Sequence, residues 1–485
     1  MEQVNTYDLV IGLEVHIQLG TLRKVFAPEG FSFGEAPNSQ VSEVTMAHPG
    51  SLPIPNMECI YRVAKLGLAL GCEIAAETRF ARKNYFYPDL PKGYQLSQAE
   101  NPICMGGELP FILPDGTQGA VALERIHMEE DAGKLIHDQH ATASMVDLNR
   151  AGTGLAELVT RPELHSPEAA AACFASIQQL VRYLGVGEGD MEKGMLRCDA
   201  NVSLKPAGAA KLGTRVEVKN LNSFNFLQAA IRFEAKRQAE LLRSGELVQQ
   251  ETRTFNPSSG TTAPMRDKET AADYRYFPDP DLQPIRLGKE KLASLKAEIP
   301  SLPLERLKQY REEYGMAHAK AVAIISEKTE SDYFEGLIAS GCTPKAAANW
   351  LLGPVREFLK EQKQEITSFP LDSVQLTRFI NLVEQRTITR EAAMGEIWPR
   401  LLAKPDVDPR ALAENLGLMA RTDTSELEQA MKELVDQFPN EVARYRKGKK
   451  GLKGFFVGEL MKKFGKKADP KTVSSMVIKV LEEKN

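Results

Sequence analysis

The 485-residue sequence has few cysteines and no long apolar run, and no secretory signal is visible in it. Its six cysteines include no Cys-x-x-Cys pair, which is typical of reduced thiols in the cytoplasm rather than of disulfides or a zinc cluster. No apolar run approaches the roughly 20 residues that span a bilayer, so we expect no membrane contact. The N-terminus shows no basic segment followed by an apolar one, so we expect a cytoplasmic protein.

Several common catalytic motifs are also missing. The sequence contains no P-loop, no Gly-x-Gly-x-x-Gly, no His-Glu-x-x-His and no Gly-x-Ser-x-Gly. If the protein uses ATP, it does not bind ATP through a Walker fold. We find no internal repeat and no low-complexity tract.

Charge is present in abundance but is unevenly distributed. Residues 444–471 carry eleven Lys or Arg against two acidic residues, a net charge of +9, which leaves −13 on the remainder because the whole chain carries −4. A basic tail on an acidic body is typical of proteins that contact a polyanion such as nucleic acid. A solvated tail that only improves solubility is the plainer interpretation.

Length and composition predict two or three domains. The N-terminal part mixes short alternating segments with two helices, one over residues 169–184 after the capping Ser166, and one over residues 224–243. The next part is helical throughout, and a Pro-rich linker over residues 404–409 leads to a small unit that ends in an amphipathic helix. The expected domains are residues 1–293, 294–405 and 406–485.

Four separated stretches alternate apolar residues with residues that bind hard cations. Because side chains alternate across a strand, each stretch places its polar side chains on one face. The residues that share a face are Glu14, His16 and Gln18; His127 and Glu129; Asp199 and Asn201; and Glu217 and Lys219. If these strands lie in one sheet, their ligand set favours Mg²⁺ or Mn²⁺ over zinc. An ordinary antiparallel sheet with one solvated face is the alternative.

Three other segments allow two interpretations each. Residues 80–95 are a rigid, loop-like stretch that either grips a phosphate or stacks a base, or is a surface loop whose tyrosines pack on the core. Residues 152–154 are either a Gly-Thr-Gly turn that presents amides to an anion or only a turn. Arg275, among aromatics and prolines, is either a phosphate clamp or a structural arginine.

Seven segments in order resemble GatB, the family of B subunits of the tRNA-dependent amidotransferases. They are IGLEVHIQL (11–19), RKNYFYPDLPKGYQLSQ (82–98), HMEEDAGK (127–134), VDLNRAGTGLAELV (146–159), LRCDANVSL (196–204), EVKNLNSFN (217–225) and DYRYFPDPDLQP (273–284). The resemblance covers essentially the whole chain. It implies an α+β multidomain fold, in which a mixed or antiparallel-sheet cradle domain precedes an all-α helical domain and a small all-α tail domain that contacts tRNA.

The resemblance also implies an activity, that of one subunit of a ligase that forms carbon–nitrogen bonds. Such a subunit uses ATP and Mg²⁺ to phosphorylate the side-chain carboxylate of Glu-tRNA(Gln) or Asp-tRNA(Asn), and ammonia from a partner glutaminase (the A subunit) then displaces the phosphate. A small C subunit completes the heterotrimer. This chain has no Gly/Ser-rich amidase signature, so we expect it not to hydrolyse glutamine itself. The alternative is a non-catalytic tRNA-binding scaffold in the same kind of complex.

Individual residues match functional positions of the family. The implied metal ligands are Glu14, His16, Glu129 and Glu217. The implied catalytic residues are Lys83, Tyr85 and Glu129. The implied cofactor-binding residues are Lys83, Asp199, Asn201 and Arg275. Many relatives bind zinc through two cysteine pairs in the region of residues 26–49, where this chain has no cysteine, so we expect no zinc.

Overall fold

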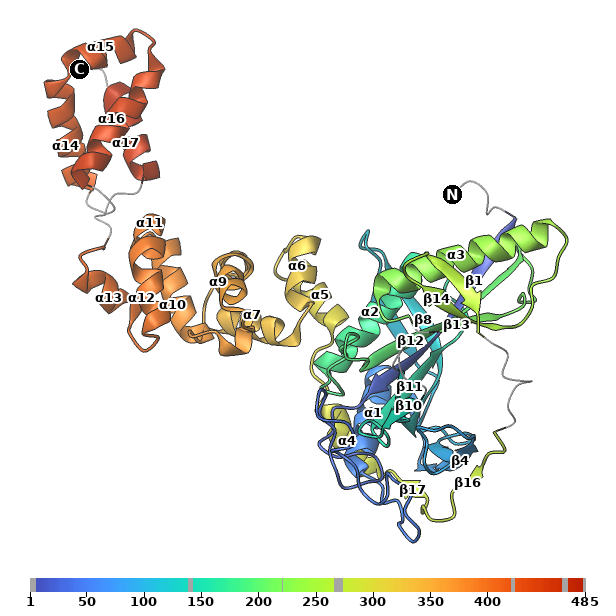
Figure 1. Ribbon diagram of the computed structural model, residues 1–485. Helices are drawn as coiled ribbons and strands as arrows, with labels where there is room; N and C mark the ends of the chain where they lie inside the picture. The colour runs from blue at the N-terminus through green and yellow to red at the C-terminus, as the bar shows by residue number, and fades with distance from the viewer. Residues whose placement is uncertain are drawn as a thin grey trace. The chain divides into compact units, whose positions relative to one another are not determined.

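The computed structural model describes residues 6–137, 143–219, 221–265, 274–419, 424–464 and 470–482. The chain forms two compact units, Met1–Arg306 and Leu307–Asn485. The first unit contains the strands and the second is helical (Figure 1). The α+β multidomain fold expected from the sequence is therefore confirmed, while its division into three domains stays a prediction.

A 13-stranded sheet, counted over the described residues, forms the centre of the first unit. Its middle strands, in spatial order, are β13 (Val216–Lys219), β12 (Leu196–Pro206), β1 (Tyr7–Gln18), β11 (Gly154–Thr160), β8 (Gln118–Glu130), β5 (Tyr94–Ser97) and β4 (Ala81–Asn84). Each of these neighbours pairs antiparallel, whereas β13 pairs in parallel with β14 (Thr252–Asn256), so the sheet is mixed. The four alternating stretches thus lie in one sheet.

The two faces of this sheet differ in polarity, as the alternation predicts. Leu13, Val15 and Ile17 of β1 are fully buried, whereas Glu14 and His16 are partly exposed on the other face. Burying one such apolar side chain contributes about 1.5–3 kcal/mol, so a one-residue slip of register would be strongly unfavourable. The apolar face joins a core to which four helices contribute: α1 (Met57–Ala69), α2 (Pro167–Tyr183), α3 (Phe224–Arg243) and α4 (Lys289–Ala297).

Both long helices of this unit begin at serine caps, of which Ser166 was predicted and Ser223 was not. Ser166 Oγ accepts a hydrogen bond of 3.0 Å from the Ala169 amide, and Ser223 Oγ accepts one of 3.1 Å from the Phe226 amide. Such caps satisfy amide groups that the first helical turn leaves unpaired. Both predicted helices are confirmed; α3 has the predicted limits, and α2 begins two residues before its predicted start.

The prediction of a loop over residues 80–95 was wrong at both ends. β4 and β5 form an antiparallel pair with Ala81 opposite Ser97 and Asn84 opposite Tyr94, and only the segment between them is a loop. Arg82 on β4 explains part of the difference, because its guanidinium lies over the Tyr94 ring at 4.2 Å. Such cross-strand contacts override the local turn propensity of prolines and glycine.

The Gly-Thr-Gly segment is a turn. Gly152 has a φ of +81°, and its amide donates to the Asp131 carbonyl at 2.9 Å, while the Thr153 amide donates to the Arg150 carbonyl at 3.0 Å. Because these amides are already bonded within the protein, the interpretation as an anion site was wrong for them.

The second unit consists of short helices, and its last four helices share a core of their own. These are α14 (Thr424–Gln437), α15 (Pro439–Arg446), α16 (Lys453–Phe464) and α17 (Pro470–Glu482). Val473, Val477 and Leu481 of α17 are fully buried, which confirms the predicted amphipathic terminal helix. Residues 465–469 of the basic segment lie outside the described residues. No described helix is long and apolar enough to cross a membrane.

Candidate active site

Three polar side chains lie in one row across the middle of the sheet. His16 on β1 is directly opposite Glu157 on β11, which is directly opposite His127 on β8. Directly opposite residues of an antiparallel pair point to the same face. Glu157 Oε2 is therefore close to both imidazoles, 3.4 Å from His16 Nε2 and 3.2 Å from His127 Nε2.

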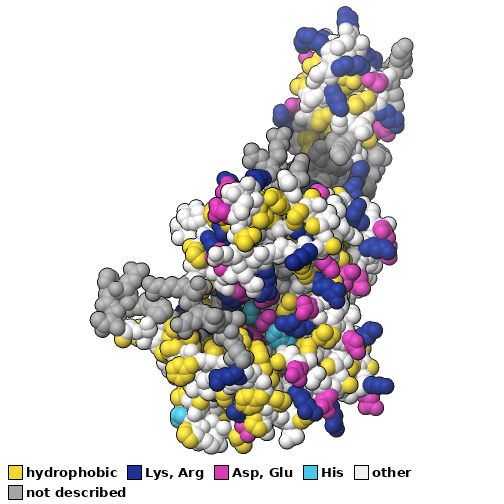
Figure 2. Space-filling view, turned by 90° about the vertical axis from the view of Figure 1, so that its right-hand side faces the viewer, with side chains coloured by type: hydrophobic (Ala, Val, Ile, Leu, Met, Phe, Trp, Pro, Cys, Tyr) yellow, Lys and Arg dark blue, Asp and Glu magenta, His cyan; other side chains and the backbone are white. Residues whose placement is uncertain are grey.

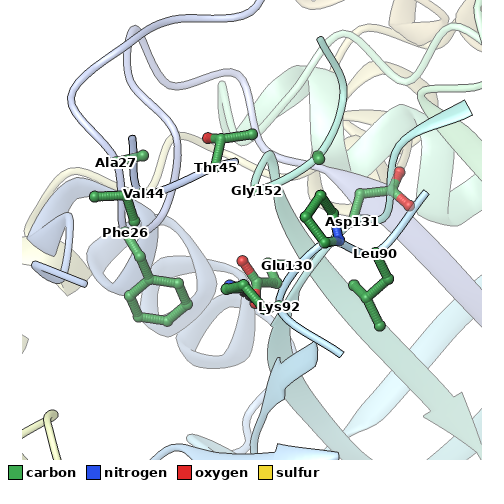
Figure 3. Close-up of a pocket in the computed structure, with 11 residues that line it drawn as sticks. Phe26, Ala27, Val44, Thr45, Leu90, Lys92, Glu130, Asp131 and Gly152 are labelled. Carbon is green, nitrogen blue, oxygen red and sulfur yellow. Dashed lines mark hydrogen bonds and ion pairs between the residues drawn. The ribbon is translucent and has the colours of Figure 1, made fainter. Parts of the chain in front are cut away.

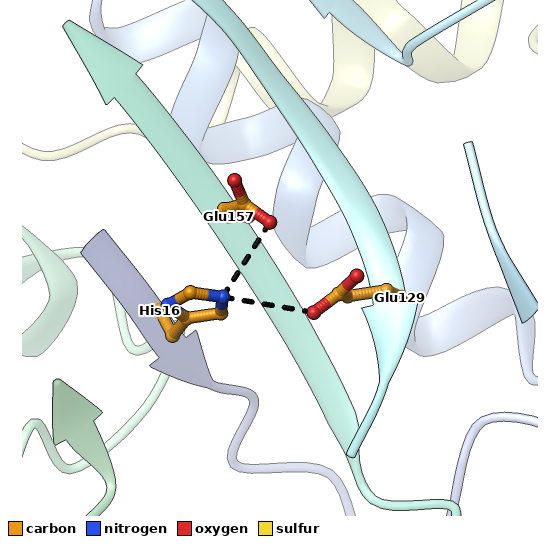
Figure 4. Close-up of side chains that lie close together, drawn as sticks. All are labelled: His16, Glu129 and Glu157. Carbon is orange, nitrogen blue, oxygen red and sulfur yellow. Dashed lines mark ion pairs between the residues drawn. The ribbon is translucent and has the colours of Figure 1, made fainter. Parts of the chain in front are cut away.

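Glu129, two residues after His127 on β8, completes a candidate metal centre. Its Oε1 lies 3.7 Å from His16 Nε2, and one ligand atom each from His16, Glu129 and Glu157 lie within 4.8 Å of one another (Figure 4). Figure 2 shows acidic and His side chains gathered in a hollow of the surface. Two carboxylates and one imidazole form an oxygen-rich set that suits Mg²⁺ or Mn²⁺. Because these carboxylates are nearly buried, a nearby positive charge is needed to offset their repulsion.

The surroundings of His16 favour its protonated form, which would supply part of that positive charge. Burial lowers the pKa of His16, but its hydrogen bond to Glu157 and the charges of Glu157 and Glu129 outweigh burial and raise the pKa above its ordinary value. Burial raises the pKa of Glu157, but its hydrogen bonds with His127 and His16 outweigh this and hold the pKa far below its ordinary value. A metal ion at this position would have to displace the His16 proton.

Lys83 and Tyr85 approach the same carboxylate from the edge of the sheet. Lys83 Nζ lies 4.0 Å from Glu129 Oε2. Burial lowers the pKa of Lys83, but the charge of Glu129 reverses the effect and raises it, so Lys83 stays an ammonium. Burial and the charge of Glu129 raise the pKa of Tyr85, so its hydroxyl keeps its proton and donates weakly, at 3.4 Å, to Gln95 Oε1. The three implied catalytic residues therefore lie together.

The remaining implied residues other than Arg275 form a second polar group on β1, β12 and β13. Asn201 Nδ2 donates to Glu14 Oε1 at 2.7 Å, while Lys219 Nζ lies 3.2 Å from Asp199 Oδ2 and 2.9 Å from Glu217 Oε1. Of the four implied metal ligands, the structure thus brings His16 and Glu129 together and places the other two in this second group.

Arg275 lies apart from that second group, beside β4. It is exposed and has a φ of +46°, and its carbonyl accepts a hydrogen bond of 2.9 Å from Asn84 Nδ2. Among the implied cofactor-binding residues, Lys83 and Arg275 therefore lie at the β4 edge, whereas Asp199 and Asn201 lie on β12.

Sequence reasoning did not select Glu157 or His127 as site residues. Glu157 is the only charged residue in the run Leu155-Ala156-Glu157-Leu158-Val159. A lone carboxylate in an apolar strand is a signal that could have been used, since such a residue is rarely buried without a partner. His127 was recognised as sharing a face with Glu129, but its contact with Glu157 depends on a strand pairing that the sequence does not reveal.

A small pocket lies against the segment of residues 20–56. It is lined by Phe26, Ala27, Val44, Thr45, Leu90, Pro91, Lys92, Glu130, Asp131, Ala151 and Gly152 (Figure 3). Its volume of about 10 Å³ corresponds to roughly one water molecule. Lys92 Nζ forms an ion pair with Glu130, which also accepts a hydrogen bond of 2.9 Å from the Leu96 amide. Because its volume is that of about one water molecule, the pocket is too small for a substrate.

A buried lysine links the parts of the segment 20–56 to one another. The side chain of Lys24 is fully buried, and its Nζ donates to the Gln40 carbonyl at 2.8 Å and lies 3.2 Å from Glu29 Oε1. Thr45 Oγ1 donates to the same carboxylate. These contacts join three stretches of the segment, and the expectation of no zinc stays a prediction.

Comparisons with known proteins agree over nearly the full length. Residues 9–293 match the family model described as the GatB/GatE catalytic domain, and residues 332–481 match the GatB domain. The B subunits of several aspartyl/glutamyl-tRNA(Asn/Gln) amidotransferases are similar throughout. The one from Thermosynechococcus vestitus is 43% identical over 98% of this chain and 97% of its own. The one from Thermodesulfovibrio yellowstonii is 43% identical over 98% of this chain and 100% of its own. The one from Chlorobium chlorochromatii is 42% identical over 98% of this chain and 99% of its own. The chain therefore belongs to the family of B subunits of the aspartyl/glutamyl-tRNA amidotransferases.

Proposed function

We propose that this chain activates the side-chain carboxylate of glutamate or aspartate carried by tRNA, by phosphorylating it with ATP, and then transfers ammonia to it. The observation that supports this most strongly is the convergence of His16, Glu129 and Glu157 from three strands, with the Lys83 ammonium 4.0 Å from Glu129. A cation site beside a fixed ammonium is suited to a phosphoryl transfer between two anions.

The two steps solve a leaving-group problem. A carboxylate is a poor acylating agent because it would have to expel oxide. In the first step a carboxylate oxygen attacks the terminal phosphorus of ATP, the bond from that phosphorus to the bridging oxygen breaks, and ADP leaves. In the second step ammonia adds to the acyl carbon and loses a proton, and phosphate leaves with the bonding electron pair. The products are the amide, ADP and phosphate.

The residues of the site have distinct parts in this chemistry. His16, Glu129 and Glu157 would hold the Mg²⁺, which neutralises phosphate charge when bound. Lys83 stays charged and would bind a phosphate oxygen or the substrate carboxylate. Tyr85 keeps its proton and would donate a hydrogen bond to the same anion.

Residues of the second polar group are proposed to contact the nucleotide or the metal. The proposed nucleotide contacts are Asp199 and Asn201 on β12, together with Arg275 beside β4. Glu14 and Glu217 are proposed as further metal contacts. Glu14 and Glu217 already have protein partners, Asn201 at 2.7 Å and Lys219 at 2.9 Å, so a ligand would have to replace those contacts.

Partner proteins are part of the proposal, because the relatives are subunits of larger enzymes. We propose that a glutaminase, the A subunit, supplies ammonia and that a small C subunit completes a heterotrimer. Exposed basic residues of the last four helices and of the connection between α15 and α16 are proposed to contact tRNA phosphates. They include Arg444, Arg446, Lys447, Lys449, Lys450, Lys462 and Lys463.

Amidation of mischarged tRNA with ammonium chloride as nitrogen donor tests the proposal. The chain is assembled with its partner subunits and given ATP and Mg²⁺, and ammonium bypasses the glutaminase. We expect amidated tRNA and ADP in equal amounts, and loss of both with Glu129→Gln while tRNA affinity is retained. If tRNA binds but ATP is never consumed, the non-catalytic scaffold is the correct interpretation.

A further inference from the structure

Two half-exposed tyrosines stand at the rim of the candidate active site. Tyr274 and Tyr276 are 36% and 46% exposed, and neither belongs to the hydrophobic core of the first unit, whereas the neighbouring Tyr94 packs against it. We infer that Tyr276, with Tyr274 behind it, is a stacking surface for an adenine base of a substrate. The inference rests on the proposed function and adds a binding role to residues that it leaves unassigned.

The backbone of this segment is fixed to the edge of the sheet. Phe277 and Pro278 pair antiparallel with Arg82 and Ala81 of β4, and the Asn84 amide donates to the Tyr274 carbonyl at 2.9 Å. Main-chain bonds therefore hold the tyrosines in place, and burial of their rings is not needed to do so. A rigid support is what a binding surface needs, because little conformational freedom is then lost when a ligand binds.

The rings run from the surface towards the catalytic residues. The centroids of Tyr276 and Tyr274 are 6.0 Å apart, and those of Tyr274 and Tyr85 are also 6.0 Å apart, with edge-to-face geometry in both pairs. Lys83 Nζ lies 5.1 Å from the Tyr274 centroid on one side and 4.0 Å from Glu129 on the other. A base stacked on Tyr276 would therefore be close to an ammonium that can bind the phosphate of the same nucleotide.

This combination of rings and a cation identifies the class of ligand. Aromatic side chains beside basic groups bind single-stranded nucleotides by stacking and phosphate attraction, with little dependence on sequence. Two substrates of the proposed reaction carry adenine, namely ATP and the single-stranded 3′ end of the aminoacylated tRNA. Stacking is common to both, and the experiment distinguishes them.

Substitution of Tyr276 tests the inference better than substitution of Tyr274, because Tyr274 contacts Lys83. Tyr276→Ala should weaken binding of one adenine-bearing substrate by about 10-fold, since a stacked base typically contributes 1–3 kcal/mol. Tyr276→Phe should retain binding, because the ring suffices for stacking. Phe33→Ala, which removes a 57% exposed ring elsewhere in the same unit, is the matched control and should have no effect.

Two binding measurements on the assembled complex identify the ligand without requiring turnover. One is equilibrium dialysis with ATP, and the other is the fluorescence of tRNA that carries 2-aminopurine as its last base, which stacking quenches. Loss of ATP affinity alone would assign the surface to ATP, and loss of tRNA quenching alone would assign it to the 3′ end. Unchanged binding of both substrates by Tyr276→Ala, or equal impairment of the Phe variant, would overturn the inference. A complex that binds both substrates but forms no amide would contradict only the proposed function.

Discussion

Glu157 lies directly across the strand pair from His127, with its Oε2 3.2 Å from His127 Nε2. The other nitrogen of that imidazole, Nδ1, is buried and has no hydrogen-bond partner within the described part of the chain. The contact with Glu157 is therefore the interaction that orients His127, and it in turn orients the carboxylate towards His16. Groups that hold a metal-binding carboxylate in this way commonly matter almost as much as the ligands themselves.

Replacing His127 should weaken metal binding more than it slows the chemical step. With His127→Gln, we expect the affinity for Mn²⁺, measured by electron paramagnetic resonance titration, to fall by about 10- to 100-fold. At saturating metal the turnover number should stay close to that of the unaltered protein. His48→Gln, an exposed histidine, is the control. Equal metal affinity in both variants would show that His127 only fills space.

Glu157 should be as necessary for activity as Glu129, although it is less obvious from the sequence. Glu157→Gln removes one of the two carboxylate charges and should lower amidation by at least about 100-fold, because a bound cation contributes several kcal/mol to such reactions. Glu124→Gln, on the exposed part of β8, should change the rate little. If the Glu157→Gln protein is active at ordinary Mg²⁺ concentration, Glu157 is not part of the active site.

Lys24 should stabilise the segment of residues 20–56. Lys24→Met leaves the Glu29 carboxylate without its ammonium and should reduce the free energy of unfolding by about 3–5 kcal/mol, the usual effect of breaking a buried ion pair. The double variant Lys24→Met with Glu29→Gln should recover part of this loss. A thermal unfolding midpoint that is unchanged in the single variant would mean that the ion pair contributes no net stability.

The basic residues of the last four helices and of the connection between α15 and α16 should give tRNA binding its salt dependence. Changing Lys449, Lys450, Lys462 and Lys463 to Gln should weaken binding and reduce the slope of log affinity against log salt by about 1 for each phosphate that the protein no longer neutralises. Gln at Lys289 and Lys296 of α4 (Lys289–Ala297) serves as the control. If the slope does not change, these residues only solubilise the chain.

The sequence alone was sufficient for properties that depend on local periodicity. The two-residue alternation in β1 correctly assigned Leu13 and Val15 to the core and His16 to the polar face, because burial of apolar side chains decides which face points inwards. The Ser166 cap likewise placed the start of α2 to within two residues. These signals lie within a few residues of the features that they predict.

Features that depend on distant pairings could not be predicted in the same way. His16 meets Glu157 because β1 and β11 are neighbours with a particular register, and alternation fixes a face but not a neighbour. For the same reason the separation of Glu14 and Glu217 from the His16 group became visible only in the structure. The β4 strand was missed because its proline- and glycine-containing connection to β5 suggested a continuous loop, and because its other partner, the segment at Phe277, is distant in sequence.

The fate of ¹⁸O in the substrate carboxylate tests the central claim most directly. Mischarged tRNA carrying glutamate with both side-chain oxygens labelled is given to the assembled complex with ATP, Mg²⁺ and ammonium chloride, and the released phosphate is analysed by mass spectrometry. If the carboxylate is phosphorylated, each phosphate released with an amide carries one ¹⁸O, and Glu157→Gln abolishes both products. Amide formation with unlabelled phosphate would contradict the account, because the carboxylate oxygen would then not have been transferred to phosphorus.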